Sequence, residues 1–174
     1  QIEPLLPNGR VFVDMFLGGG TVALNVVDKY EYVIGAEIVK PLTDLHLSYQ
    51  KDEGFIDRVT KLNNHYPDSL EGYLQLRTDY NLEPSSAKLQ CLLLRSNSNM
   101  MRFSNKTGFN IPFGKRNHYN LERMLAHKEA CSEVEVFAGS WEGLFGKKSV
   151  LPDANPHEYV FYSDCPYANS KAAY

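Results

Sequence analysis

Four consecutive residues near the end of the chain combine an acid, a thiol, a proline-fixed turn and an aromatic ring. They are Asp164, Cys165, Pro166 and Tyr167, and they follow an apolar stretch at 159–163 that is expected to be a short strand. In an open α/β sheet, ligands bind outside the carboxyl ends of the strands. A carboxylate and an aromatic ring at that place suit a flat ring that bears an amino group. A plain strand-ending turn is the simpler interpretation of these four residues taken alone.

A strand and a glycine turn are expected near the start of the chain. Residues 10–16 are nearly all apolar, as expected for a central parallel strand that is buried on both faces. Gly18, Gly19 and Gly20 follow, and a helix is expected to begin near Thr21, which would be its N-cap. This order is typical of a nucleotide-binding βαβ unit, in which glycines let the backbone approach a ligand closely. The spacing is not that of the dinucleotide fingerprint, and there is no Walker lysine.

An acid ends the next expected strand. That strand covers residues 32–37, and Glu37 comes 23 residues after Asp14. A carboxylate at that place typically accepts hydrogen bonds from ribose hydroxyls. The pair of acids therefore favours a ribose-bearing cofactor. A surface acid after an edge strand is the alternative interpretation of Glu37.

The basic residues of the chain are concentrated in one segment. The total formal charge is −3 for 174 residues. Residues 95–128 contain seven basic residues and one acid, a net charge of +6 that leaves −9 for the remainder. Such asymmetry indicates a polyanionic partner better than the total charge does. A solvated basic face would give the same count.

The middle of the chain is expected to be a mainly helical insert that carries a β-hairpin. Apolar residues recur at three- and four-residue spacing from residue 41 to about residue 94. Residues 105–108 then form a turn that is expected to join strands at 101–103 and 109–111. A two-stranded ribbon fits the DNA major groove, where arginine reads guanine and asparagine reads adenine. A helix at 121–130 and a strand at 133–138 are expected to return the chain to the sheet.

Composition excludes several other classes of protein. The three cysteines, Cys91, Cys131 and Cys165, have no paired spacing. This argues against a disulfide framework or a metal site and suits a reducing cytosol. No apolar run reaches the roughly 20 residues that a membrane span requires. We therefore expect a cytoplasmic protein with no membrane partner.

Together the motifs resemble those of the adenine-specific DNA methyltransferases of the DNA adenine methylase (Dam) type, the D12 class. Residues 12–21 resemble the S-adenosylmethionine-binding motif of that family. Residues 73–81 resemble its helical domain, and residues 98–103 with 108–116 resemble its target-recognition hairpin. The motif at 164–167 stands where the family carries its catalytic Asp-Pro-Pro-Tyr.

The resemblance implies an α/β fold with a Rossmann-like methyltransferase sheet and a DNA-recognition insert. Residues 1–48 would begin the catalytic domain, 49–128 would form the insert, and 129–174 would return to the catalytic domain. The sheet is expected to be incomplete in this chain, which lacks the family's amino-terminal lysine motif and ends seven residues after Tyr167. The implied reaction transfers a methyl group from S-adenosylmethionine to the amino group of adenine in double-stranded DNA, with GATC as the expected site. The implied setting is a bacterial or phage-infected cell, and a monomer and a DNA-bound dimer both stay open.

The resemblance also assigns roles to single residues. Those expected to bind the cofactor are Asp14, Phe16, Gly18, Gly19, Gly20, Glu37, Ser140, Trp141 and Asp164. Those expected to contact DNA are Arg95, Asn99, Met100, Arg102, Asn110, Pro112, Lys115 and Arg116. Arg116 would read a guanine, or alternatively hold a phosphate. Trp141 is alternatively a core or interface aromatic residue.

The catalytic residues implied by the resemblance are Asp164, Cys165, Pro166 and Tyr167. Asp164 and the backbone carbonyl of residue 165 would accept the two N–H bonds of the adenine amino group, which makes its nitrogen more nucleophilic. Tyr167 would stack on the base once it is flipped out of the duplex.

Two positions depart from the family. Cys165 replaces its usual proline, and Glu37 replaces its usual aspartate. Cys165 leaves open a nucleophile of the kind that cytosine-ring methylases use. It also leaves open a catalytically weakened DNA-binding relative. An RNA or protein methyltransferase is a third alternative, but it does not predict the basic hairpin.

Overall fold

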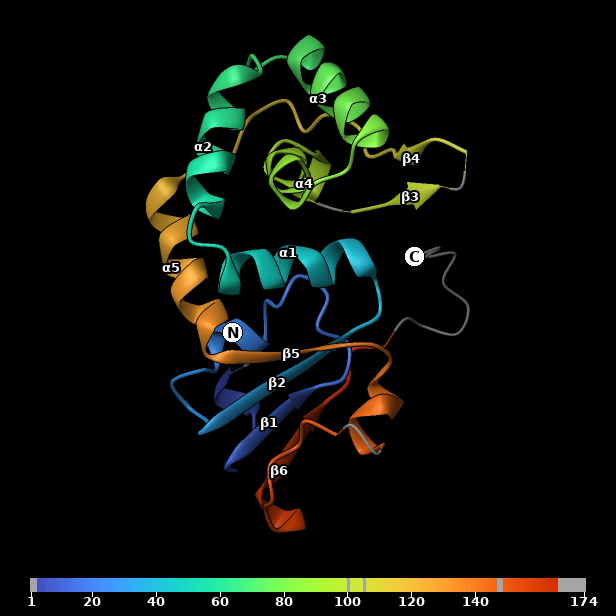
Figure 1. Cartoon of the computed structure of the whole chain (residues 1–174). Coiled ribbons are helices and arrows are strands. Elements are labelled where there is room, and N and C mark those ends of the chain that lie inside the picture. Colours follow the sequence, from blue (N-terminus) through green and yellow to red (C-terminus); the bar gives the residue numbers. More distant parts are fainter. Residues whose placement is uncertain (1–2, 100, 105, 147–148, 166–174) are drawn as a thin grey trace. The chain divides into compact units, whose positions relative to one another are not determined.

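A computed structural model of the chain describes residues 3–99, 101–104, 106–146 and 149–165 (Figure 1). The chain divides into two compact units. Among the described residues, the first unit holds 3–50 and 126–165 and the second holds 51–125. None of the helices formed by these residues is long and apolar enough to cross a membrane.

The first unit is built on a sheet in which every strand pair is parallel. Its strands are β1 (Val11–Asp14), β2 (Tyr32–Glu37), β5 (Val134–Ala138) and β6 (Tyr159–Tyr162), in the order β5-β2-β1-β6 (Figure 1). β2 and then β5 lie on one side of β1, whereas β6 lies on its other side. The strand order therefore reverses between β1 and β6, and ligands bind at such a switch point in open α/β sheets. The predicted α/β class with a parallel sheet is confirmed.

Apolar side chains cover both faces of this sheet. On one face, Phe12, Val33, Val134 and Val160 are buried in one cluster. On the other face, Val11, Val13, Ile34, Ala36 and Leu144 are buried in a second cluster. All four residues of β1 are buried, which confirms the predicted central strand.

The prediction of a helix that begins near Thr21 is wrong. The segment forms only the 3-10 turn η2 (Ala23–Asn25). The backbone N–H of Asn25 donates to the carbonyl of Val22 at 3.0 Å, the spacing of a 3-10 turn. The side-chain amide of Asn25 donates to the carbonyl of Thr21 at 2.7 Å. In an α-helix, this carbonyl would instead accept a backbone N–H.

A helix after β2 and the carboxyl-terminal part of a helix before β5 complete the first unit. Helix α1 (Lys40–Lys51) follows β2, and α5 (Leu121–Ser132), which was predicted at 121–130, ends just before β5. The side-chain amide of Gln50 donates to the carbonyls of Cys131 at 2.8 Å and Val134 at 2.6 Å. The end of α1 is thereby tied to the connection that leads from α5 into β5. Shorter 3-10 turns are η1 (Glu3–Leu5), η4 (Trp141–Phe145) and η5 (Pro156–Glu158).

The second unit is mainly helical. It contains α2 (Phe55–His65), α3 (Leu70–Leu82) and α4 (Ser86–Leu93), and α4 packs against the other two (Figure 1). Tyr73 and Leu76 of α3 are completely buried. Ser85 caps α4 by accepting a hydrogen bond from the Lys88 N–H at 3.3 Å.

The second unit also carries a short antiparallel ribbon. It pairs β3 (Phe103–Ser104) with β4 (Gly108–Phe109), so that Phe103 lies opposite Phe109. This pairing lies nearer the turn than the strands expected at 101–103 and 109–111. Before the ribbon, the 3-10 turn η3 (Asn97–Asn99) lies beside the segment that follows the ribbon, because the N–H of Asn97 donates to the carbonyl of Pro112 at 2.9 Å.

Candidate active site

Three carboxylates lie at the same edge of the parallel sheet. Asp14 ends β1, Glu37 ends β2, and Asp164 comes two residues after the end of β6. The carboxyl ends of parallel strands meet at one edge, so these acids surround the switch point. Asp14 and Glu37 are buried, whereas Asp164 is exposed.

Asp14 is an acid in an unfavourable electrostatic position. Its side chain is 2% exposed. Loss of hydration on burial raises the pKa of Asp14 to about 6, and the charges of Asp164 and Glu37 add to this rise. The Phe16 N–H, which donates to Asp14 Oδ1 at 3.1 Å, opposes it. A cation at this edge would relieve the repulsion among the three acids.

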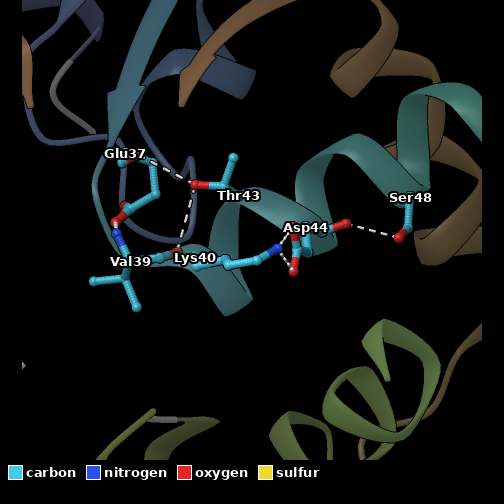
Figure 2. A network of polar contacts seen from close by, with 6 residues as sticks. All are labelled: Glu37, Val39, Lys40, Thr43, Asp44 and Ser48. Atoms are coloured by element: carbon cyan, nitrogen blue, oxygen red, sulfur yellow. Dashed lines mark hydrogen bonds and ion pairs between the residues drawn. The ribbon is translucent and has the colours of Figure 1, made fainter. Parts of the chain in front are cut away.

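Both carboxylate oxygens of Glu37 accept hydrogen bonds from backbone N–H groups, and Figure 2 shows the one from Val39. Oε2 accepts the N–H of Gly18 at 2.8 Å, and Oε1 accepts the N–H of Val39 at 2.6 Å. The hydroxyl of Thr43 donates to the backbone carbonyl of Glu37 at 3.2 Å. Glu37 therefore joins the glycine turn, the end of β2 and the start of α1. A carboxylate has about four lone-pair sites, so acceptor capacity is left for a ligand.

The glycine turn has a backbone that other residues rarely adopt. Gly18 and Gly20 have φ of 52° and 76°, in the left-handed region. A Cβ on Gly19 would meet no atom within 4 Å, so this side of the turn is open. Leu17 packs on β2, where a Cβ on Gly35 would lie 2.5 Å from Leu17 Cδ1. The missing side chain in β2 thus lets the turn lie close to the sheet.

Residues that were expected to flank a cofactor lie near the same edge. Phe16 is half-buried and Ser140 is exposed, and the Ser140 hydroxyl donates to the carboxylate of Glu142. Trp141 is half-buried and packs against the core cluster of Val11 and Leu144. The N–H of Gly139 donates to the carbonyl of Glu37 at 2.9 Å, which places the turn after β5 beside the end of β2.

The predicted catalytic motif begins in the described part of the chain. Asp164 and Cys165 are both exposed after β6. The carbonyl of Tyr162 accepts the N–H of Met15 at 3.0 Å, which holds the end of β6 beside the end of β1. Pro166 and Tyr167 lie outside the described residues.

Arg95, expected to contact DNA, is buried in the second unit. Its side chain is 1% exposed. Its guanidinium donates to the carbonyls of Asn63 at 2.7 Å, Tyr66 at 3.1 Å and Pro67 at 3.2 Å. These carbonyls lie at the carboxyl end of α2, where the helix leaves acceptors without partners. We therefore correct the expectation for Arg95, which caps α2 instead of facing solvent.

Two other predicted DNA contacts bind each other. Arg102 Nε donates to Asn110 Oδ1 at 2.7 Å, and the Asn110 N–H donates to the Arg102 carbonyl at 3.1 Å. Arg102 is exposed and Asn110 is half-buried. The pair extends the ribbon beyond Phe103 and Phe109 and presents a guanidinium and an amide together. Met100 lies outside the described residues.

The remaining predicted DNA contacts are exposed. They are Asn99, Pro112, Lys115 and Arg116. Asn99 and Lys115 have φ of 51° and 69°, and Ser98 next to Asn99 has φ of 59°. Backbone strain in non-glycine residues of this kind is typical of functional loops. Arg116 Nε donates to His118 Nε2 at 3.0 Å.

Comparison with known proteins decides the family. The family model for the D12 class N6 adenine-specific DNA methyltransferase matches residues 1–174. The chain belongs to this family. The family is one of DNA-modifying enzymes, and the family resemblance read from the motifs is confirmed.

Curated relatives of this D12-class chain carry methylase names. It is similar to the modification methylase StsI of Streptococcus sanguinis, at 31% identity over 187 residues that cover 100% of this chain and 27% of that protein. It is 26% identical to the DNA adenine methylase of Escherichia coli K12 and 24% identical to that of Vibrio cholerae O395, over 97% of this chain and 60% of each relative. The D12-class chain therefore spans 27% to 60% of the length of these relatives.

Sequence reasoning missed three residues that this D12-class chain places in its candidate sites. His46 of α1 contacts the glycine turn, with Nε2 2.8 Å from the Gly18 carbonyl oxygen. Ile38 follows Glu37 and is 71% exposed, an unusual place for a large apolar side chain. Asn81, at the end of α3, makes hydrogen bonds to the ribbon. The signal for His46 was its position in the stripe of buried residues on one face of α1, where a lone histidine passes for core.

Proposed function

We propose that the chain is the part of a DNA adenine methyltransferase that transfers a methyl group from S-adenosylmethionine to the exocyclic amino group of adenine in double-stranded DNA. The observation that carries this proposal is the meeting of Asp14, Glu37 and Asp164 at the switch point of one parallel sheet. GATC is the proposed site because the segments at 98–103 and 108–116 resemble the recognition hairpin of the Dam type.

The residues at this edge fit S-adenosylmethionine. The cofactor carries a cationic sulfonium and a cationic ammonium group, and three carboxylates complement these charges better than they would an anionic dinucleotide. The open side of Gly19 lets the backbone approach the ligand. Glu37 would accept ribose hydroxyls with its remaining lone pairs, and the exposed Ile38 offers apolar surface to an adenine ring. When bound, the cofactor supplies an electrophilic methyl group.

Asp164 is the proposed catalytic acceptor. It is exposed at the end of β6, where it can reach a base that has left the duplex. Its carboxylate and the backbone carbonyl of Cys165 would accept the two N–H bonds of the adenine amino group. The lone pair of that nitrogen would then point at the incoming methyl group, and the proton that the methylated nitrogen must lose would pass to the carboxylate of Asp164. This is electrostatic preorganisation without a covalent intermediate.

The second unit is the proposed DNA reader. Lys115 and Arg116 are exposed in a strongly basic segment, which suits contacts to phosphates and to guanine. The exposed Arg102 with its partner Asn110 presents the donors and acceptors that base edges require. Phe103 and Phe109 face Tyr80 of α3 with ring centroids 6.3 and 6.0 Å from the Tyr80 ring, so the ribbon is braced by α3.

Asn81 fixes the recognition ribbon to α3. Its amide donates to the carbonyls of Thr107 at 3.0 Å and Phe109 at 3.1 Å and accepts the Phe109 N–H at 2.8 Å. We expect Asn81→Ala to weaken binding to a GATC duplex by about tenfold, because two hydrogen bonds to β4 and one to the turn before it are lost. Fluorescence anisotropy with labelled duplex measures this. Thr78→Ala, one turn earlier on the exposed face of α3, is the control and should bind normally. Equal losses in both variants would contradict the proposed role of Asn81.

The pKa of Asp14 predicts how cofactor binding depends on pH. Its carboxyl has a pKa of about 6, so it is ionised at pH 7 and mostly protonated at pH 5. Only the ionised form attracts a cation, so the Kd for S-adenosylmethionine should become about tenfold weaker between about pH 7 and pH 5. Titration calorimetry at a series of pH values tests this. The dependence should vanish in Asp14→Asn, and an equally steep dependence in that variant would assign it to another group.

Transfer of a tritiated methyl group tests the proposed function. The labelled cofactor is offered with a GATC duplex, a duplex with an altered site, an RNA of the same sequence, and protein. We expect label in the GATC duplex alone, and we expect that DNA to resist a methylation-sensitive GATC nuclease and to become a substrate for a methylation-dependent one. Label confined to RNA or protein would overturn the proposal.

One alternative function has a specific observation behind it. Cys165, exposed after Asp164, replaces the proline that the family carries at that position and removes one rigid residue from the turn. A DNA-binding relative with weakened catalysis would bind the GATC duplex and transfer no label. Restoration of transfer by Cys165→Pro would then identify this residue as the cause.

A further inference from the structure

His46 is a buried histidine that contacts the glycine turn at two points. Its side chain is 4% exposed on α1. Its Nε2 lies 2.8 Å from the carbonyl oxygen of Gly18. Its Cε1 lies 3.2 Å from the position that a Cβ on Gly20 would take, so the ring packs directly against the turn.

Gly18 is therefore held through both of its backbone groups. Its N–H donates to Glu37 Oε2 at 2.8 Å, and its carbonyl accepts from His46 Nε2 at the same distance. Gly18 has φ of 52°, one of many conformations open to a glycine, so these two hydrogen bonds select it from the others. Glu37 comes from the end of β2 and His46 from α1, so two separate elements fix one peptide.

The protonation state of His46 suits this role. Burial lowers the pKa of His46, which keeps the imidazole neutral near pH 7. A carbonyl oxygen only accepts, so Nε2 must carry the proton of the neutral ring. The Gly18 carbonyl thus has a permanent donor.

We propose that His46 is a positioning residue that holds the glycine turn in its ligand-accepting conformation, with Glu37 on the other side of Gly18. The inference rests on the proposed function, because the ligand in question is S-adenosylmethionine. His46 touches neither the methyl group nor the base. Its loss therefore weakens the affinity for the cofactor and does not change the rate of the chemical step.

The test measures cofactor affinity with three variants of His46. Trp141, the one tryptophan of the sequence, lies at the same sheet edge and provides a fluorescence signal for titration with S-adenosylmethionine. His46→Leu should raise the Kd by about tenfold, because the Gly18 carbonyl loses its donor. His46→Gln, whose amide N–H has a similar reach, should restore binding to within about threefold of the native protein. His46→Asn has the same amide on a shorter side chain and should bind as weakly as His46→Leu.

A control separates positioning from general stability. His127 of α5 is a half-buried histidine that packs edge-on against Tyr49 at 4.6 Å between ring centroids. His127→Leu should lower the Tm and leave the Kd for S-adenosylmethionine unchanged. At saturating cofactor, kcat should stay within about twofold in His46→Gln and His46→Asn, so that their difference lies in KM.

The outcomes distinguish this inference from the proposed function. If the native protein does not bind S-adenosylmethionine, the proposed function fails and this inference fails with it. Native binding with an unchanged Kd in His46→Asn overturns the inference alone, as does an equal loss in His46→Asn, His46→Gln and His127→Leu. The Gln and Asn variants keep a polar side chain, so they decide the matter even where His46→Leu does not fold.

Discussion

Replacing Asp164 by alanine should lower kcat for methyl transfer by about 10²- to 10³-fold, the range seen when one preorganised electrostatic group is removed from an active site. The Kd for S-adenosylmethionine should weaken by less than about tenfold, because Asp14 and Glu37 remain at the sheet edge. Asp164 is exposed after β6, so its truncation to alanine opens no cavity in the core. Single-turnover transfer of labelled methyl to a GATC duplex measures the effect.

The control for Asp164 is another acid of the same unit. Asp153 is exposed in the loop before β6 and does not stand at the end of a strand. Asp153→Ala should retain native kcat. A kcat for Asp164→Ala within about threefold of the native value would contradict its catalytic role.

Replacing Glu37 by alanine should raise the Kd for S-adenosylmethionine by about 100-fold. Hydrogen bonds to a charged group contribute about 1.5–3 kcal/mol each, and the substitution leaves the N–H groups of Gly18 and Val39 without acceptors. It also removes one of the carboxylates that complement a cationic ligand. Calorimetric titration well below the Tm of the variant measures the loss.

Two further substitutions test whether the loss of affinity comes from the hydrogen bonds that Glu37 makes or from its charge. Glu37→Gln keeps one acceptor oxygen and should lose less affinity than Glu37→Ala. Asp44→Ala removes a carboxylate from the same helix start (Figure 2), where Asp44 pairs with Lys40 at 2.7 Å and is half exposed. It should bind the cofactor normally. A similar loss in Asp44→Ala would mean that charge alone, and not the hold on Gly18, sets the affinity.

The strand ends of the candidate site could be predicted because they depend on local patterns. A continuous apolar run marks a strand that is buried on both faces, and an acid directly after it has to lie at the sheet edge. β2 therefore has the predicted bounds, and β1 lies inside its predicted range. The four-strand order and the place of β6 beside β1 depend on pairing between distant segments, so the sequence did not predict them.

The rest of the site depended on partners that are distant in sequence or on competition between hydrogen bonds. Arg95 adds to the basic charge that indicates DNA, yet its partners Asn63 and Tyr66 are about 30 residues away and only the fold brings them together. Asn25 takes a carbonyl that a helix would have needed, which no apolar periodicity reveals. His46 looks like an ordinary core residue until its contact with Gly18 is seen.

The base that receives the methyl group tests the central claim most directly. After incubation with S-adenosylmethionine, a GATC duplex is digested to nucleosides and analysed by mass spectrometry. The proposed site, with Asp164 as an acceptor for an exocyclic amino group, predicts N6-methyldeoxyadenosine, and it predicts that Cys165→Ala keeps this product. Methylation at carbon 5 of cytosine, lost in Cys165→Ala, would make Cys165 a nucleophile and would contradict the account.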